Sequence, residues 1–165
     1  MKGSQEPVAI TLRRAAMHML ARREHSFHEL LDKLSLKYPD LSPGTDILPA
    51  VQRLRDQNLQ SDSRFVGAFV RYRSTRGVGP QKITAELYSR KLDQDLLQQA
   101  LYNSDIDWEA SCLEVLSRKF KPTSSVDMLQ KQRWQRFLLQ RGFAHEHVSA
   151  AIKTLSKQGA GVDEY

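Results

Sequence analysis

The chain has a single cysteine, Cys112, among its 165 residues, so it cannot form an internal disulfide. Secreted proteins usually carry paired cysteines, and a lone one therefore argues against an oxidising compartment. No run of about 18 apolar residues is present, which argues against a membrane-spanning helix. The first residues, MKGSQEPVAITLRRAA, lack the apolar stretch and cleavage site of a secretory signal. We therefore expect a cytoplasmic protein that does not associate with a membrane.

The sequence also lacks a recognisable catalytic pattern. His25 and His28 have a spacing that could bind metal, but no cysteine or third clustered ligand accompanies them. Cys112 lies among apolar residues at helical spacing, which is typical of a small core residue rather than a nucleophile. The segment 76–80, RGVGP, is rich in glycine, but its proline removes an amide that a phosphate-binding loop needs. We expect a protein with no enzymatic activity and no cofactor.

Strand signals are nearly absent, because apolar residues recur at spacings of three and four rather than alternating. These spacings predict helices, and one pair of predicted helices is repeated. Residues 87–101, LYSRKLDQDLLQQAL, match residues 138–152, LLQRGFAHEHVSAAI, at a distance of 51 residues. Apolar positions coincide, for example at Leu97 and Val148, and a weaker copy lies near Glu29. Such periodicity is typical of helical repeat proteins.

The repeat predicts an all-α protein, an elongated and curved tandem array of three three-helix repeats of helix-turn-helix type. We place the repeats at residues 1–58, 59–103 and 104–158, followed by a frayed tail at 159–165. A linker rich in proline, serine and glycine, residues 38–44, interrupts the first repeat. Because three short helices bury little surface alone, we expect neighbouring repeats to share apolar contacts.

Capping residues predict where helices begin and end. Ser26, three residues before Glu29, forms a capping-box pattern. Asp62 is expected to cap the first helix of the second repeat. Gly142 is placed for a left-handed helix cap. Lys91 occupies the matching turn of the second repeat, where a residue other than glycine costs about 1 kcal/mol.

The spacing of Leu138, Gly142 and Val148 is that of a DNA-binding helix-turn-helix. A stand-alone DNA-binding protein that inserts the last helix of a repeat into a groove is therefore one interpretation. The other is that the corner simply packs three helices compactly. The helices that would enter the groove, residues 93–103 and 145–158, carry acidic residues at their starts. These acidic residues would repel phosphate and favour the packing interpretation.

The net charge of +6 and the pI near 9.6 favour acidic partners, including nucleic acid. Basic residues concentrate in segments 71–91 and 118–141, each of which holds a single acidic residue. These side chains either contact phosphate or an acidic protein, or form a solvated basic face. Tyr72 and Trp134, each flanked by arginines, are expected to be core residues rather than stacking platforms. The candidate contacts are Arg71, Arg73, Arg76, Lys82, Arg90, Lys91, Lys131, Arg133, Arg136 and Arg141.

Four stretches together resemble the RecX family of bacterial recombination regulators, and the resemblance extends over about residues 10–155. Each stretch is weak alone, but their order along a chain of three-helix repeats is specific. One departure is Lys91, where the family often has glycine. The stretches are REHSFHELLDKL (23–34), DSRFVGAFVRYR (62–73), RGVGPQKITAEL (76–87) and RFLLQRGF (136–143).

The resemblance implies a non-enzymatic modulator of the RecA recombinase. Members of the family bind the RecA nucleoprotein filament, block its extension or promote its disassembly, and so lower its ATPase, strand-exchange and co-protease activities. The fold implied is an elongated repeat array that lies in the groove of the filament. A monomer with weak, non-specific affinity for single- or double-stranded DNA is expected, and the basic candidates would supply the contacts.

Overall fold

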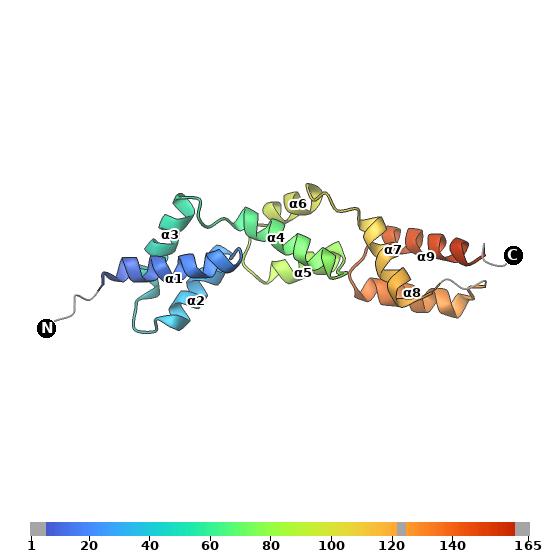
Figure 1. The fold of residues 1–165 in the computed structure, drawn as a ribbon, viewed down its shortest axis with the longest axis horizontal. Helices are drawn as coiled ribbons and strands as arrows, with labels where there is room; N and C mark the ends of the chain where they lie inside the picture. Colours follow the sequence, from blue (N-terminus) through green and yellow to red (C-terminus); the bar gives the residue numbers. More distant parts are fainter. Residues whose placement is uncertain (1–5, 122–124, 161–165) are drawn as a thin grey trace.

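The computed structural model describes residues 6–121 and 125–160. Within these ranges the chain forms nine α-helices and no strand. The helices follow one another in groups of three along an extended molecule, whose two ends lie far apart (Figure 1). In this part of the chain, no helix combines the length and the apolar character needed to cross a membrane. The predicted all-α, elongated repeat architecture is confirmed.

The first unit contains three helices and a single π-helical turn. The Ser26 side chain accepts a 3.1 Å hydrogen bond from the Glu29 amide and caps the second helix. Ser42 caps the π-helical turn in the same way, with Pro43 directly after it. The elements are α1 (Val8–Arg22), α2 (Phe27–Lys37), η1 (Pro43–Ile47) and α3 (Leu48–Asp56), and the buried core is Leu12, Ala15, Ala16, Phe27, Leu30, Leu34, Ile47, Val51 and Leu54.

The second unit begins at the capping residue Ser61, whose hydroxyl accepts from the Arg64 amide. Pro80 occupies the first turn of its second helix, where the missing amide has no helical partner to lose. Asp93 caps its third helix. The helices are α4 (Asp62–Thr75), α5 (Pro80–Tyr88) and α6 (Gln94–Tyr102), and the core is Phe65, Val66, Val70, Val78, Ile83, Leu87 and Leu97.

The third unit packs α7 chiefly against α9, with α8 closing the core. Its last helix continues through buried Gly159 to Ala160, two residues into the segment predicted as a frayed tail. The rest of that predicted tail, residues 161–165, lies outside the described residues. The helices are α7 (Trp108–Lys119), α8 (Met128–Gln140) and α9 (His145–Ala160), and the core is Cys112, Leu116, Trp134, Leu138, Phe143, Val148, Ala151 and Leu155.

The 51-residue repeat describes the same structural positions twice. Leu97 and its counterpart Val148 are both about 1% exposed, each on the last helix of its unit. Lys91 and its counterpart Gly142 both adopt left-handed backbone, with φ of 55° and 88°. The predicted left-handed turn at Lys91 is therefore confirmed, and a side chain occupies a conformation that favours glycine.

Two predictions about individual residues are wrong. Asp62 does not cap α4; its carboxylate instead accepts from the Phe27 amide at 2.8 Å, at the start of α2 in the neighbouring unit. Tyr72 is not a core residue, because 54% of it is exposed, whereas Trp134 is fully buried as predicted. The stripe of aromatic residues on α4 therefore runs from the core out to the surface.

The first junction between units is polar. Besides the Asp62 contact, the Gln60 side chain donates to the His25 carbonyl at 3.2 Å. Arg64 pairs with Glu24 across the same junction at 2.9 Å. These bonds hold the α1–α2 connection against the start of α4, so the second unit is attached without a shared apolar core.

The second junction combines backbone hydrogen bonds with one shared apolar residue. The Gly79 amide donates to the Arg141 carbonyl at 2.8 Å, and the Gln81 amide donates to the Gly142 carbonyl at 3.0 Å. Trp108 packs against the cores of both the second and the third unit. The apolar sharing expected between neighbouring repeats is thus concentrated at this junction.

Candidate functional site

The basic candidates lie on the surface, as residues available to a partner should. Arg73 and Arg141 are only partly exposed and are engaged within the protein, while the other candidates are exposed. Within the described residues, none of those others forms an ion pair or donates a side-chain hydrogen bond to the protein. The available cations are Arg71, Arg76, Lys82, Arg90, Lys91, Lys131, Arg133 and Arg136.

Arg73 has a structural partner. Its guanidinium forms two hydrogen bonds with Glu86 of α5, from Nε to Oε2 at 2.8 Å and from Nη2 to Oε1 at 2.5 Å. Both side chains are largely sheltered, with 26% and 29% exposure. The hydrogen bond to Glu86 outweighs partial burial and raises the pKa of Arg73. Arg73 therefore joins α4 to α5, and its charge is already neutralised.

Three candidates meet at the second junction. Arg141 donates from Nη1 to the Arg76 carbonyl at 3.3 Å, which joins residues 65 positions apart. Lys82 lies directly against Gly142. A Cβ atom built on that glycine would be only 2.3 Å from the Lys82 Cβ. The Arg76 guanidinium stacks over the Tyr72 ring at 4.9 Å. The two glycine-containing turns therefore bring cations of the second and third units together.

Arg90 and Lys91 lie at the first junction. The left-handed backbone at Lys91 reverses the chain directly after Arg90. The Arg90 guanidinium lies over the rings of Phe69 and Phe65, at 5.0 and 5.8 Å from their centres. Lys91 faces a shallow depression that also includes His28 and other residues of α2. These cations are thus separated along the molecule from the group at the second junction.

The remaining candidates follow α8. Lys131, Arg133 and Arg136 are all exposed on this helix, while Trp134 between them is fully buried. Arg133 lies over the Phe120 ring at 5.7 Å. Arg133 and Arg136 therefore flank Trp134 in sequence but not in space, because the indole is buried in the core, as predicted.

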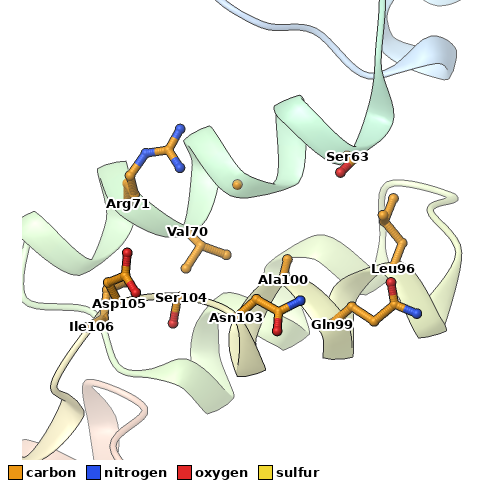
Figure 2. Close-up of a pocket in the computed structure, with 11 residues that line it drawn as sticks. Ser63, Val70, Arg71, Leu96, Gln99, Ala100, Asn103, Ser104, Asp105 and Ile106 are labelled. Atoms are coloured by element: carbon orange, nitrogen blue, oxygen red, sulfur yellow. The ribbon is translucent and has the colours of Figure 1, made fainter.

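Arg71 lies beside a groove between α4 and α6 of about 470 Å³. In Figure 2, Val70 points toward α6, while Arg71 leaves α4 in another direction. Polar side chains of α6 and the following loop, including Gln99 and Asn103, line the other wall. The Arg71 guanidinium lies over Gly67, because a Cβ built there would be 3.4 Å from its Nη1. The groove also holds the Asp105 carboxylate, but within the described residues Arg71 forms no ion pair with it.

The starts of the would-be recognition helices are already occupied or acidic. The Asp93 carboxylate accepts from the Asp95 and Leu96 amides at 2.8 and 3.3 Å. The α6 amides that a phosphate would need are therefore engaged by a carboxylate. Glu146 stands in the first turn of α9 with an 82% exposed side chain. Both features oppose insertion of α6 or α9 into a DNA groove.

The sequence analysis missed a charged cluster beside the first junction. Partial burial disfavours the charged form of Glu29, but hydrogen bonds from Arg23 and Lys33 outweigh it and lower the pKa of Glu29 to about 2. His25 is 3% exposed; its Nδ1 donates to the Arg23 carbonyl and its Nε2 accepts from Lys33. Burial lowers the pKa of His25. The sequence signals for this cluster were the capping-box pattern and the family-like stretch 23–34, which contains all of its residues.

Neither histidine of the predicted pair joins a metal site. In the described part of the chain, no group of three histidine, cysteine or carboxylate side chains is placed to hold a metal ion. Cys112 is fully buried, and this burial raises the pKa of its thiol to about 12. A thiol with such a pKa is almost wholly protonated at neutral pH, which suits a packing role.

The fold and its surface define a tandem array of three-helix units with cations grouped along its length. The family model for the second three-helix domain of RecX matches residues 61–101. The family model for the third three-helix domain of RecX matches residues 105–152. The chain is 42% identical to "Regulatory protein RecX" of Pseudomonas entomophila (strain L48), over 88% of this chain and 91% of that one. It is 37% identical to the protein of the same name from Legionella pneumophila, over 84% and 91%.

The chain belongs to the RecX family. It is therefore a regulatory protein rather than an enzyme. A crystal structure of RecX from Lactobacillus salivarius has the same fold, with a TM-score of 0.72 and 19% sequence identity, covering 91% of this chain and 97% of that one. The resemblance inferred from the four sequence stretches is confirmed.

Proposed function

We propose that this protein is a negative regulator of the RecA recombinase that acts in the cytoplasm on the RecA–DNA filament. It binds along the filament groove, at the filament end, or both, and limits extension, ATP hydrolysis, strand exchange and co-protease activity. Membership of the RecX family over nearly the whole chain carries the proposal.

The shape of the molecule supports binding to a long, repetitive partner. Three units succeed one another along one axis (Figure 1), so several can contact successive positions of a filament. Individually modest contacts on linked modules give a high combined affinity when the geometry allows them to engage together. The extended surface of the described residues is suited to this mode of binding.

We choose among the cationic candidates by the partners that each has within the protein. We assign the contacts with RecA or DNA to the eight candidates that form neither an ion pair nor a side-chain hydrogen bond within the described residues. Arg73 and Arg141 are assigned structural roles, because they join α4 to α5 and the second unit to the third. We expect the same exposed cations to give a weak, non-specific affinity for DNA, because they can neutralise its phosphates.

The assay that tests this function is hydrolysis of ATP by cognate RecA on single-stranded DNA. Added below the concentration of RecA, the protein should reduce the steady-state rate, and no inhibition over a wide concentration range would overturn the proposal. Arg133→Glu with Arg136→Glu should weaken inhibition while the melting temperature stays unchanged. The control is the double variant Lys153→Glu with Lys157→Glu. It changes the net charge by the same amount, at exposed positions of α9.

A stand-alone helix-turn-helix protein is the alternative, and the carboxylate cap at Asp93 disfavours it. A footprint at a defined duplex sequence would support this alternative. Weak binding without sequence preference, falling steeply with salt, would fit the filament regulator instead. We propose that the protein acts as a monomer, which sedimentation of the purified protein would establish.

A further inference from the structure

A cleft of about 490 Å³ opens between the first unit and the second. Its floor is a strip of α4 that includes Ala68, Phe69 and Tyr72. Arg23 and Glu24 of the α1–α2 connection form one side, and Arg90 approaches from the turn after α5. An occupant of this cleft would therefore contact two units at once.

The cleft has one unpaired charge. Arg23 pairs with Glu29 at 2.5 Å, and Glu24 pairs with Arg64 at 2.9 Å. Arg90 is exposed, and in the described structure it has neither an ion pair nor a side-chain hydrogen bond. Its stacking on Phe69 holds the guanidinium at the edge of the apolar floor. Because stacking uses the face of a guanidinium, its N–H groups remain available to an acceptor.

Tyr72 is the second unusual feature of the cleft. It is 54% exposed, although it continues the aromatic stripe of Phe65 and Phe69 on α4. The Arg76 guanidinium covers its ring at 4.9 Å and orients it. Half-exposed tyrosines beside stacked arginines have the composition of residues that dominate protein–protein binding energy.

We propose that this cleft is a docking site for a partner protein segment that presents an apolar side chain next to a single carboxylate. The apolar side chain packs on Phe69 and Tyr72, and the carboxylate accepts hydrogen bonds from Arg90. The assignment rests on the proposed function, in which the segment belongs to the RecA filament. It adds an anchor point to a surface otherwise described by its positive charge.

The charges in the cleft favour a protein segment over a nucleic-acid strand. A strand carries a phosphate at every nucleotide and needs several cations along its path. Here the only cation without a charged partner among the lining residues is Arg90, which suits one carboxylate rather than a row of phosphates. Arg76 also covers one face of the Tyr72 ring, which reduces the surface on which a base could stack.

The test is binding of fluorescently labelled protein to a preassembled filament of cognate RecA on single-stranded DNA. Tyr72→Ala and Arg90→Ala should each weaken binding at least tenfold. Tyr88→Ala is the matched control, because Tyr88 is 52% exposed on α5 and lies outside the cleft. Arg55→Ala controls for losing a stacked arginine, since Arg55 lies over Phe27 at 4.6 Å. Both controls should stay within twofold of the wild type.

Tyr72→Ala is decisive because it leaves the net charge unchanged. Thermal melts establish that each variant is folded, and Ala68→Leu, which fills the cleft without removing a contact, provides an independent variant with the same expected loss. Tyr72→Ala and Ala68→Leu within twofold of wild type would overturn the docking site while the proposed function stands. If the two variants lost affinity for single-stranded DNA without RecA by the same factor, the cleft would be a nucleic-acid site. That result would also overturn the proposed protein docking site. Absence of filament binding by the wild type would instead remove the proposed function, and this assignment with it.

Discussion

The backbone amide of Gly79 donates a 2.8 Å hydrogen bond to the carbonyl of Arg141, and this contact seats the second unit directly on the third. The contact is possible only because the glycine has no side chain. A Cβ atom at position 79 would lie 2.3 Å from the Gly142 carbonyl carbon, and backbone cannot move aside as a flexible side chain can. The relative placement of the two units therefore depends on two glycines from separate repeats.

Gly79→Ala should consequently destabilise the protein and loosen this junction. We expect a loss of about 2–3 kcal/mol in the free energy of unfolding, within the range of severe single substitutions. Denaturant unfolding followed by circular dichroism measures it. Gly44→Ala is the control, because no atom lies within 4 Å of a Cβ built at Gly44, and it should change stability by less than about 0.5 kcal/mol. Equal stability of the two variants would contradict the role of the junction.

Arg71 and Arg73 should behave differently although they are two residues apart. Arg73→Ala breaks the sheltered pair with Glu86 and should cost about 1 kcal/mol of stability. Arg71→Ala should leave stability unchanged and weaken RecA inhibition instead. A double-mutant cycle with Glu86→Gln isolates the pair, and a coupling energy near zero would show that Arg73 does not hold α4 to α5.

Lys91→Gly should stabilise the protein. Lys91 has a φ of 55°, and a glycine adopts this conformation without the steric cost that a side chain brings. We expect a gain of up to about 1 kcal/mol. Gln98→Gly, an exposed site in the interior of α6, is the control and should lose about 1 kcal/mol. A loss of stability in Lys91→Gly would mean that the lysine side chain makes a contribution beyond its backbone conformation.

Acid should weaken the protein through Glu29. Its pKa lies at about 2 in the folded protein against an ordinary value of 4.5, because Arg23 and Lys33 hold the carboxylate in its charged form despite partial burial. A depressed folded-state pKa contributes stability above the unfolded pKa, so this contribution is lost as the pH falls from about 4.5 to about 2. Thermal melts across this range measure the loss.

Glu29→Gln should lower stability at pH 7 by about 1–2 kcal/mol, allowing for the exposure of its two partners to solvent. The variant should also lose less stability than the wild type between pH 4.5 and pH 2. Glu146→Gln is the control, because the Glu146 side chain is 82% exposed. Parallel pH profiles for wild type and Glu29→Gln would contradict the assignment of the acid sensitivity to Glu29.

Most of the fold could be predicted from the sequence because helix periodicity and capping are local signals. The burial of Leu97 and Val148, the cap at Ser26 and the left-handed turn at Gly142 follow from spacing within a few residues. The left-handed turn at Lys91 follows from its match to Gly142 in the repeat. The exposure of Tyr72 did not follow, because helical spacing alone cannot show where a helix face leaves the core.

The site was predicted less completely because its interactions are long-range. Nothing near Arg73 in the sequence distinguishes it from Arg71, and only folding brings Glu86 beside one of them. The glycine-rich segment at 76–80 was judged only as a phosphate-binding loop and rejected, although its backbone docks the third unit. The assignment of individual cations to RecA or DNA stays a prediction.

The position of Trp108 affects how an extended protein dissociates from a long partner. Because this side chain packs against two cores, the second and third units should move as one body, whereas hydrogen bonds and an ion pair attach the first unit to the second. The first unit can therefore change its angle or separate while the other two stay joined. On a long partner, the tryptophan-linked pair would detach as a single body, and its combined contacts would set the residence time.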